Sequence, residues 1–144
     1  MKFTASSIMR SKLVACDSTD NLKKVANKML IEKVGSVLVK KEGEFIGIII
    51  DRDILNAVVK GMDFEENLAA EIMSTPLEFC DADDSLEKCK ELFEKTNHSR
   101  LVVRKDDKIV GVLLEKFVDR FLGVSKMVSL SRLSDTPKFR TGRG

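Results

Sequence analysis

The feature that most constrains this chain is an internal repeat, in which residues recur at a constant spacing of 64 positions along a sequence of 144 residues. Two copies with the same residue pattern are expected to adopt the same fold, so the repeat fixes the architecture before any single element is considered. No gap interrupts the match. The identical pairs include Ala5 and Ala69, Ile8 and Ile72, Met9 and Met73, Cys16 and Cys80, Leu22 and Leu86, Val39 and Val103, and Gly47 and Gly111.

Each copy predicts the same order of secondary structure. A polar capping cluster precedes an amphipathic helix, two apolar runs around a polar turn predict a hairpin, and a second helix follows. The pattern is β-α-β-β-α in each copy, which places the chain in the α/β (α+β) class. The expected ranges are 22–30, 37–39, 45–50 and 51–60 in the first copy, and 86–93, 101–103, 109–114 and 115–122 in the second.

A unit of about 60 residues buries too little apolar surface to be more than marginally stable alone. We therefore expect the two copies to pack on each other around a pseudo-twofold axis, which leaves a pair of clefts between them. The sequence divides into a first repeat at 1–62, a second at 63–123 and a basic tail at 124–144. The tail carries five basic residues against the single acid Asp135, although the whole chain has a formal net charge of only +2.

Composition excludes several classes of protein. The longest apolar runs fall far short of the roughly 20 residues that a membrane-spanning helix needs. The N-terminus lacks the pattern of a signal peptide, so a cytoplasmic location is expected. Cys16, Cys80 and Cys89 have neither the pairing nor the spacing of a metal or redox motif, and we expect reduced, buried thiols and no metal site.

The run Gly47-Ile48-Ile49-Ile50-Asp51-Arg52-Asp53-Ile54-Leu55, together with Gly35-Ser36-Val37-Leu38-Val39 before the hairpin, resembles a CBS domain, named after cystathionine β-synthase. Two in tandem form a Bateman module. The resemblance covers about residues 5–123. It implies a non-catalytic regulatory module that binds an adenine nucleotide (AMP, ADP or ATP) or S-adenosylmethionine between the repeats, forms a homodimer and signals to an unknown protein effector.

The resemblance also implies a first ligand-binding cleft. The family motif places an acid at the start of the second helix, where an ionised carboxylate accepts hydrogen bonds from the ribose hydroxyls, and Asp53 fills that position. Ile50 replaces the hydroxyl residue of the family pattern. Arg52 is the candidate phosphate partner, because a helix N-terminus favours anions. The complete expected set is Asp53, Arg52, Ile49, Ser36 and Val37 from the first repeat, with Ile72, Met73, Thr75 and Pro76 from the second.

A second, weaker cleft is expected from the equivalent positions. Phe117 occupies the place of the ribose acid and cannot accept a hydrogen bond, whereas Arg100 stands where the family tends to carry a phosphate-binding base. The first repeat has Ser36 at that position. We therefore expect two unequal clefts, the second containing Arg100, Phe117, Ser6, Ser7 and Ile8.

Catalysis has little support in the sequence. His98 is the only histidine, no nucleophile and base can be assembled around it, and no phosphate-binding glycine loop of the NTPase type is present. We expect no catalytic residues, and His98 is more consistent with a turn position than with a base.

The tail supports an alternative of a different class. Met127, Val128, Leu130 and Leu133 are spaced as a short amphipathic segment, and Lys138, Arg140 and Arg143 follow. A ligand-free scaffold would use this tail to contact a partner protein or, less in keeping with its few charges, a nucleic acid. Candidate core or dimer residues outside the tail are Leu55, Val58, Val59, Val118, Phe121 and Leu122.

Overall fold

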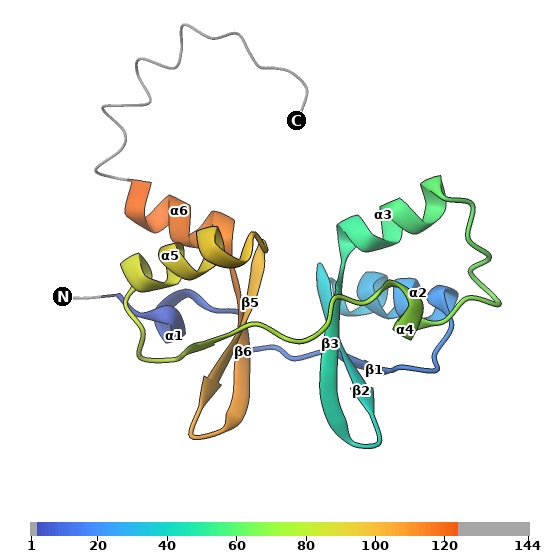
Figure 1. The fold of residues 1–144 in the computed structure, drawn as a ribbon, viewed down its shortest axis with the longest axis horizontal. Helices are drawn as coiled ribbons and strands as arrows, with labels where there is room; N and C mark the ends of the chain where they lie inside the picture. The colour runs from blue at the N-terminus through green and yellow to red at the C-terminus, as the bar shows by residue number, and fades with distance from the viewer. Residues whose placement is uncertain (1–2, 124–144) are drawn as a thin grey trace, which may run out of the picture.

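The structure is a computed structural model that describes residues 3–123, and it contains two three-stranded sheets that lie side by side (Figure 1). In the first sheet the strand order is β1-β2-β3, where β1 pairs with β2 in parallel and β2 pairs with β3 in antiparallel. The elements of this half are β1 (Ala15–Asp17), α2 (Leu22–Glu32), β2 (Ser36–Lys41), β3 (Glu44–Ile50) and α3 (Asp51–Val59).

The second sheet repeats the first one strand for strand. Its order is β4-β5-β6, and the irregularity in its hairpin between Val103 and Arg104 matches the one between Val39 and Lys40. The predicted α+β class and the tandem β-α-β-β-α order are confirmed. The elements are β4 (Phe79–Asp81), α5 (Leu86–Thr96), β5 (Arg100–Lys105), β6 (Lys108–Leu114) and α6 (Glu115–Leu122).

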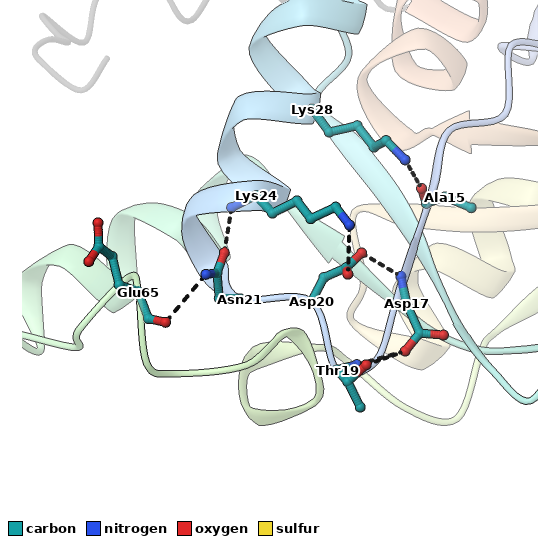
Figure 2. Close-up of polar contacts among 8 residues, drawn as sticks. All are labelled: Ala15, Asp17, Thr19, Asp20, Asn21, Lys24, Lys28 and Glu65. Atoms are coloured by element: carbon teal, nitrogen blue, oxygen red, sulfur yellow. Dashed lines mark hydrogen bonds and ion pairs between the residues drawn. The ribbon is translucent and has the colours of Figure 1, made fainter.

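The capping cluster before α2 fixes where that helix begins (Figure 2). Asn21 accepts a hydrogen bond from the Lys24 N–H at 2.8 Å, which satisfies one of the free donors of the first turn. Asp20 accepts from the Asp17 N–H at 2.9 Å and pairs with Lys24 at 3.2 Å, which ties the helix to β1. Ser85 and Asp84 repeat these roles before α5.

The two short helices exchange places between the halves. The helix α1 (Ala5–Ile8) contributes Ala5 to the core of the second half, whereas α4 (Ala69–Ile72) contributes Ala69 to the core of the first. Backbone hydrogen bonds hold both, from the Ala5 N–H to the Asp84 carbonyl at 2.9 Å and from the Ala69 N–H to the Asp20 carbonyl at 2.8 Å. The division at residue 62 describes the sequence repeats, and the packing interleaves them.

Apolar side chains form one core in each half and a third core between the sheets. Leu38 and Ile48 of the first sheet meet Val102, Val112 and Leu114 of the second, and all five are buried. This central core holds the halves together and forms the floor of the clefts between them. No helix in residues 3–123 is long and apolar enough to cross a membrane.

Candidate functional site

A cavity of about 770 Å³ lies where the two halves meet at the N-termini of α3 and α6. This volume is in the range of ordinary small-molecule sites. Its lining comes from the start of α3, the end of α5 with the turn into β5, and the start of α6. The lining residues are Ile50, Asp51, Arg52, Phe93, Glu94, Asn97, His98, Ser99, Arg100, Glu115 and Lys116.

A smaller cavity of about 50 Å³ shares Ile50, His98, Ser99 and Arg100 with the large one. It adds apolar surface from Ile48, Pro76 and Val102, and polar surface from Ser74 and Glu78. The chain before β4 runs beside β3 here, because Ser74 and Ile48 exchange backbone hydrogen bonds of 2.8 and 3.1 Å. An apolar slot beside a polar chamber suits a ligand with one apolar and one charged end.

Arg100 is the side chain that joins the two cavities. It is largely buried, yet its guanidinium has few partners: one nitrogen donates to the Ser99 hydroxyl at 3.1 Å, another lies 3.9 Å from the Asp51 carboxylate, and the buried Nε has no partner in residues 3–123. Burial lowers the pKa of Arg100, an effect that Asp51 opposes. A guanidinium remains charged even so. Arg100 is thus a cation with spare donors beside a cavity.

Asp53 lies in the first turn of α3 and caps its own helix. Its carboxylate accepts a hydrogen bond of 2.8 Å from the Ile50 N–H. Burial raises the pKa of Asp53, the Ile50 hydrogen bond opposes this shift, and the neighbouring Asp51 adds to it. Asp53 also lines a third cavity, of about 430 Å³ between α3 and α4, together with Ile72.

The structure places the remaining residues of the expected first cleft in two groups. Thr75 donates to the Ile46 carbonyl at 2.7 Å, and Met73 packs on Gly47, so this segment lies along β3 as expected. Val37 and Ile49 differ from the expectation, because their side chains are almost fully buried in the core of the first half. Only their backbone remains to contact a ligand. Ser36 begins β2 and pairs with Ile50 in the sheet register.

The expected second cleft is divided in the structure. The long side chain of Arg100 reaches Asp51 of the first half and lies near Gly35, while Arg10, whose charge adds to burial in lowering the pKa of Arg100, lies over the Phe117 ring. Ser7 accepts a hydrogen bond from the Thr4 N–H at 3.0 Å and so caps α1, while Ile8 packs against the second core. Arg100 thus lines the same cavity as Asp51 and Ile50, and its grouping with Phe117 stays a prediction.

Three basic side chains lie near the ring of Phe117. Arg10, Arg120 and Lys116 lie 5.3, 5.5 and 6.0 Å from the ring centroid, within the range of cation–π interactions. The ring also packs against the central core. An aromatic side chain thus stands where Asp53 stands in the first half.

Sequence reasoning did not assign Asp51, Ser74, Glu78 and Lys116 to the site, although they line its cavities. The repeat could have pointed to two of these residues, because Lys116 is the equivalent of Arg52, a predicted site residue, and Ser74 is the equivalent of Arg10. His98 lines both cavities, at the turn before β5.

No cysteine lines the two cavities that meet at Arg100. All three cysteines are free and buried, and burial raises the pKa of Cys16 to about 11, which disfavours a reactive thiolate. In the described part of the chain no group of three or more histidine, cysteine or acidic side chains is placed to hold a metal ion.

The fold and the cleft together define a paired α+β module. The family model of the CBS domain matches residues 5–60 and 69–116, and the chain belongs to that family as a tandem pair of CBS domains. A comparison with curated proteins gave no match.

Solved structures of CBS-domain proteins share this fold. The conserved CBS domain protein TA0289 from Thermoplasma acidophilum, of unknown function, has a TM-score of 0.77. It is 16% identical over 97% of this chain and 80% of that one. The CBS domain protein PAE2072 from Pyrobaculum aerophilum, solved with AMP, has a TM-score of 0.69 and 23% identity over 79% and 88%. The CBS domain pair of protein MJ0100, solved with 5′-methylthioadenosine and S-adenosyl-L-methionine, has a TM-score of 0.73 and 19% identity over 87% and 99%.

Proposed function

We propose that this chain is a non-catalytic regulatory module that binds an adenine nucleotide in the cleft between its halves and signals the bound state to a partner protein. The observation that carries the proposal is Arg100, a largely buried guanidinium with an unpartnered Nε beside a cavity of about 770 Å³. Leaving a buried donor without a partner costs about 1–3 kcal/mol, which an anionic ligand group would recover.

The two cavities suggest how such a ligand would lie. A phosphate would sit in the polar chamber against Arg100 and the N-terminus of α3, where Arg52 adds a second cation. The base would lie at the mouth of the apolar slot formed by Ile48, Pro76 and Val102, which would have to widen from its volume of about 50 Å³ to admit it. Asp53 would accept from the ribose if its side chain turned from the Ile50 N–H toward the cleft.

The relatives solved with AMP and with S-adenosyl-L-methionine support an adenosyl ligand in a fold of this kind. Between these two ligands we expect AMP, because its phosphate would meet the spare donors of Arg100. Since adenine nucleotides are held inside cells, we place the module in the cytoplasm. We further propose that it acts as a homodimer.

Isothermal titration calorimetry of the full chain with AMP, ATP and S-adenosylmethionine tests this function. We expect saturable binding of AMP at one site per chain, a loss of affinity in Asp53→Ala, and no change in Asp83→Ala, an exposed acid outside the lining of the cavities described. Equal affinity for AMP in the wild type and in Arg100→Met would contradict the role given to Arg100.

The scaffold alternative stays a prediction, because the tail at 124–144 lies outside the described residues. Absence of heat with all three ligands, together with no thermal stabilisation, would favour it. Deletion of 124–144 should then abolish capture of a partner protein, whereas a ligand sensor would retain its ligand affinity after the same deletion.

A further inference from the structure

The three basic side chains around Phe117 come from two distant parts of the chain. Arg10 follows α1, whereas Lys116 and Arg120 belong to α6, and their charged groups lie 5.3, 6.0 and 5.5 Å from the centroid of the ring. All three cations are exposed, and the ring is half-buried. We call these four residues the Phe117 cluster.

Backbone contacts place Arg10 in the Phe117 cluster. The Arg10 N–H donates to the Val112 carbonyl at 2.8 Å, and the Val112 N–H donates to the Arg10 carbonyl at 2.9 Å. Phe117 packs against the central core that includes Val112. Arg10 therefore reaches a ring of α6 because β6 holds its backbone there.

The helix α6 separates its charges. Its acids Glu115 and Asp119 pair with Lys90 of α5 at 3.0 and 2.7 Å. The three cations of the Phe117 cluster, by contrast, form no ion pair with an acid within residues 3–123. Like charges held this close repel one another. A bound anion would remove this repulsion, so the cluster is a candidate anion site.

The equivalent group in the first half has a different charge. Its four members, 64 positions away along the repeat, are Ser74, Arg52, Asp53 and Asn56. That group holds one cation and one acid and is formally neutral, whereas the Phe117 cluster holds three cations and no acid. Since the two sheets have the same order and register, the fold itself does not require the three positive charges.

We propose that the Phe117 cluster binds a free chain of linked phosphate groups, an inorganic oligophosphate. Guanidinium groups bind phosphate oxygens through paired hydrogen bonds, and an ammonium group adds a compact charge. A single monoanion would leave most of the positive charge unneutralised, whereas linked phosphates bring several negative charges within a short length. The ring of Phe117 offers no acceptor to a ribose hydroxyl, so the ligand needs no nucleoside.

The packing of Phe117 argues against a nucleic acid in this place. Proteins that bind single strands stack successive bases on exposed aromatic rings. Here the ring is half-buried against the central core, and three cations lie close to it. The cluster therefore offers charge and hydrogen-bond donors, without an open ring face for a base.

The Phe117 cluster borders the cavity of about 770 Å³ but differs from the nucleotide site proposed there. Lys116 lines that cavity, whereas Arg10, Phe117 and Arg120 do not. The oligophosphate site does not rest on the proposed function, because it uses neither Arg100 nor Asp53.

Isothermal titration calorimetry of the full chain with sodium tripolyphosphate tests the proposal, and the repeat supplies the variants. Arg10→Ser and Arg120→Asn replace each cation by the residue at the equivalent position of the first half. We expect each to weaken tripolyphosphate binding roughly tenfold, as for the loss of one charge-assisted contact. Affinity should also fall as the salt concentration rises.

The matched control is Lys105→Asn, which removes an exposed cation from the hairpin of the same half and should leave the affinity unchanged. All three substituted residues are exposed, so circular dichroism melts should show that the variants fold like the wild type. An equal loss of affinity in Lys105→Asn would overturn the proposal, because it would show attraction to positive charge in general.

Saturating AMP separates this site from the nucleotide cleft. Tripolyphosphate should still bind to the AMP-loaded protein with the same dependence on Arg120, and Arg120→Asn should keep its affinity for AMP. If AMP does not bind at all, the proposed function fails, while the tripolyphosphate titration still tests the Phe117 cluster. Displacement of tripolyphosphate by AMP would place the phosphate chain in the cleft and overturn the proposal.

The class of ligand is tested with three further probes in the presence of saturating AMP. Tripolyphosphate should bind more tightly than orthophosphate, and at least as tightly as ATP or a short oligodeoxythymidylate. Equal affinity for orthophosphate would indicate a site for one phosphate, tighter ATP a site for the phosphate chain of a nucleotide, and tighter oligodeoxythymidylate a nucleic-acid surface. Each of these results, or no binding of tripolyphosphate at low salt, would overturn the proposal.

Discussion

The two halves of the molecule share a backbone and differ in what their side chains can do. Their sheets have the same order and register, and the helices α2 and α5 both end at a left-handed residue, Lys33 and Asn97, with φ of 58° and 59°. The equivalents of Asp53 and Ser36 are Phe117 and Arg100. Repetition has thus preserved the packing, while the side chains at the strand and helix ends differ between the halves.

The burial pattern makes the same point. Val39 and Val103 are both fully buried, as are Leu22 and Leu86 to within 2% exposure. The exposed helix faces, by contrast, carry Leu30, Ile31 and Leu55 in the first half, where the second half has Glu94, Lys95 and Asp119. A substitution in the core should therefore act alike in both halves, and a substitution at the cleft or on the outer helix faces should not.

The largest expected effect is on core stability. Phe93→Ala should lower the free energy of unfolding by about 3–5 kcal/mol, because it removes a ring that is 1% exposed. The equivalent Met29→Ala should cost less, since Met29 is 8% exposed and smaller. Urea unfolding followed by circular dichroism measures both, as the chain has no Trp or Tyr. A greater loss of unfolding free energy in Met29→Ala than in Phe93→Ala would contradict this expectation.

Arg100→Met should separate binding from stability. The variant removes a charge-assisted contact worth about 1.5–3 kcal/mol, so AMP affinity should fall roughly tenfold to hundredfold by calorimetry. Stability should stay the same or rise, because a poorly satisfied buried cation is replaced by an apolar side chain of similar length. The matched variant Ser36→Ala should change affinity little. Marked destabilisation by Arg100→Met would show that its main role is structural.

Gly47→Ala and Gly111→Ala should each cost about 1–3 kcal/mol through overpacking. An added Cβ on Gly47 would lie 2.6 Å from the Met73 sulfur and 2.9 Å from the Ser74 carbonyl. On Gly111 the corresponding distances to Met9 and Arg10 are 2.5 and 2.8 Å. Because the close approach is the same in both halves, thermal melts should show equal losses, and a one-sided loss would mean that the exchanged segments do not support the halves equally.

Lys90→Met should have a smaller effect, about 1 kcal/mol or less, because partly exposed ion pairs contribute little. The loss should appear as a lower midpoint in thermal melts and should shrink at high salt. The converse test builds equivalents of the ion pairs that Lys90 makes with Glu115 and Asp119 into the first half, through Ala26→Lys with Leu55→Asp. If Lys90→Met leaves the salt dependence of the melt unchanged, the ion pairs do not stabilise the α5–α6 contact.

Asp53→Asn is expected to give the smallest change, and its sign depends on pH. Since burial raises the pKa of Asp53 above its unfolded value, the folded protein takes up the proton first as pH falls. At neutral pH the charged carboxylate of Asp53 therefore disfavours folding. This cost disappears as the pH falls through the raised pKa toward the pKa of the unfolded chain. Asp53→Asn should match or exceed the wild type in urea midpoint at neutral pH and lose that advantage in acid. A lower midpoint at neutral pH would show that the cap on Ile50 outweighs burial.

The sequence predicted the repeated fold well because apolar periodicity and the 64-residue spacing act on the backbone locally. The motif placed Asp53 at the start of α3, where it lies, and its role toward a ribose stays a prediction. The approach of Arg100 to Asp51 was not predicted, because a long side chain can reach from one half to the other and no local pattern records its direction. Val37 and Ile49 were expected at the cleft, although in an apolar strand sequence alone does not say which side chains face the core.

The exchange of the short helices has a practical consequence for attaching this protein to anything else. Both ends of the described chain leave from the second half, through α1 and α6 (Figure 1). A tag, a surface linkage or a fused domain joined directly to residue 3 or residue 123 would therefore sit beside that half. The first half would project from such an anchor as the free arm, with Leu55 and Val59 presented to whatever approaches from solution.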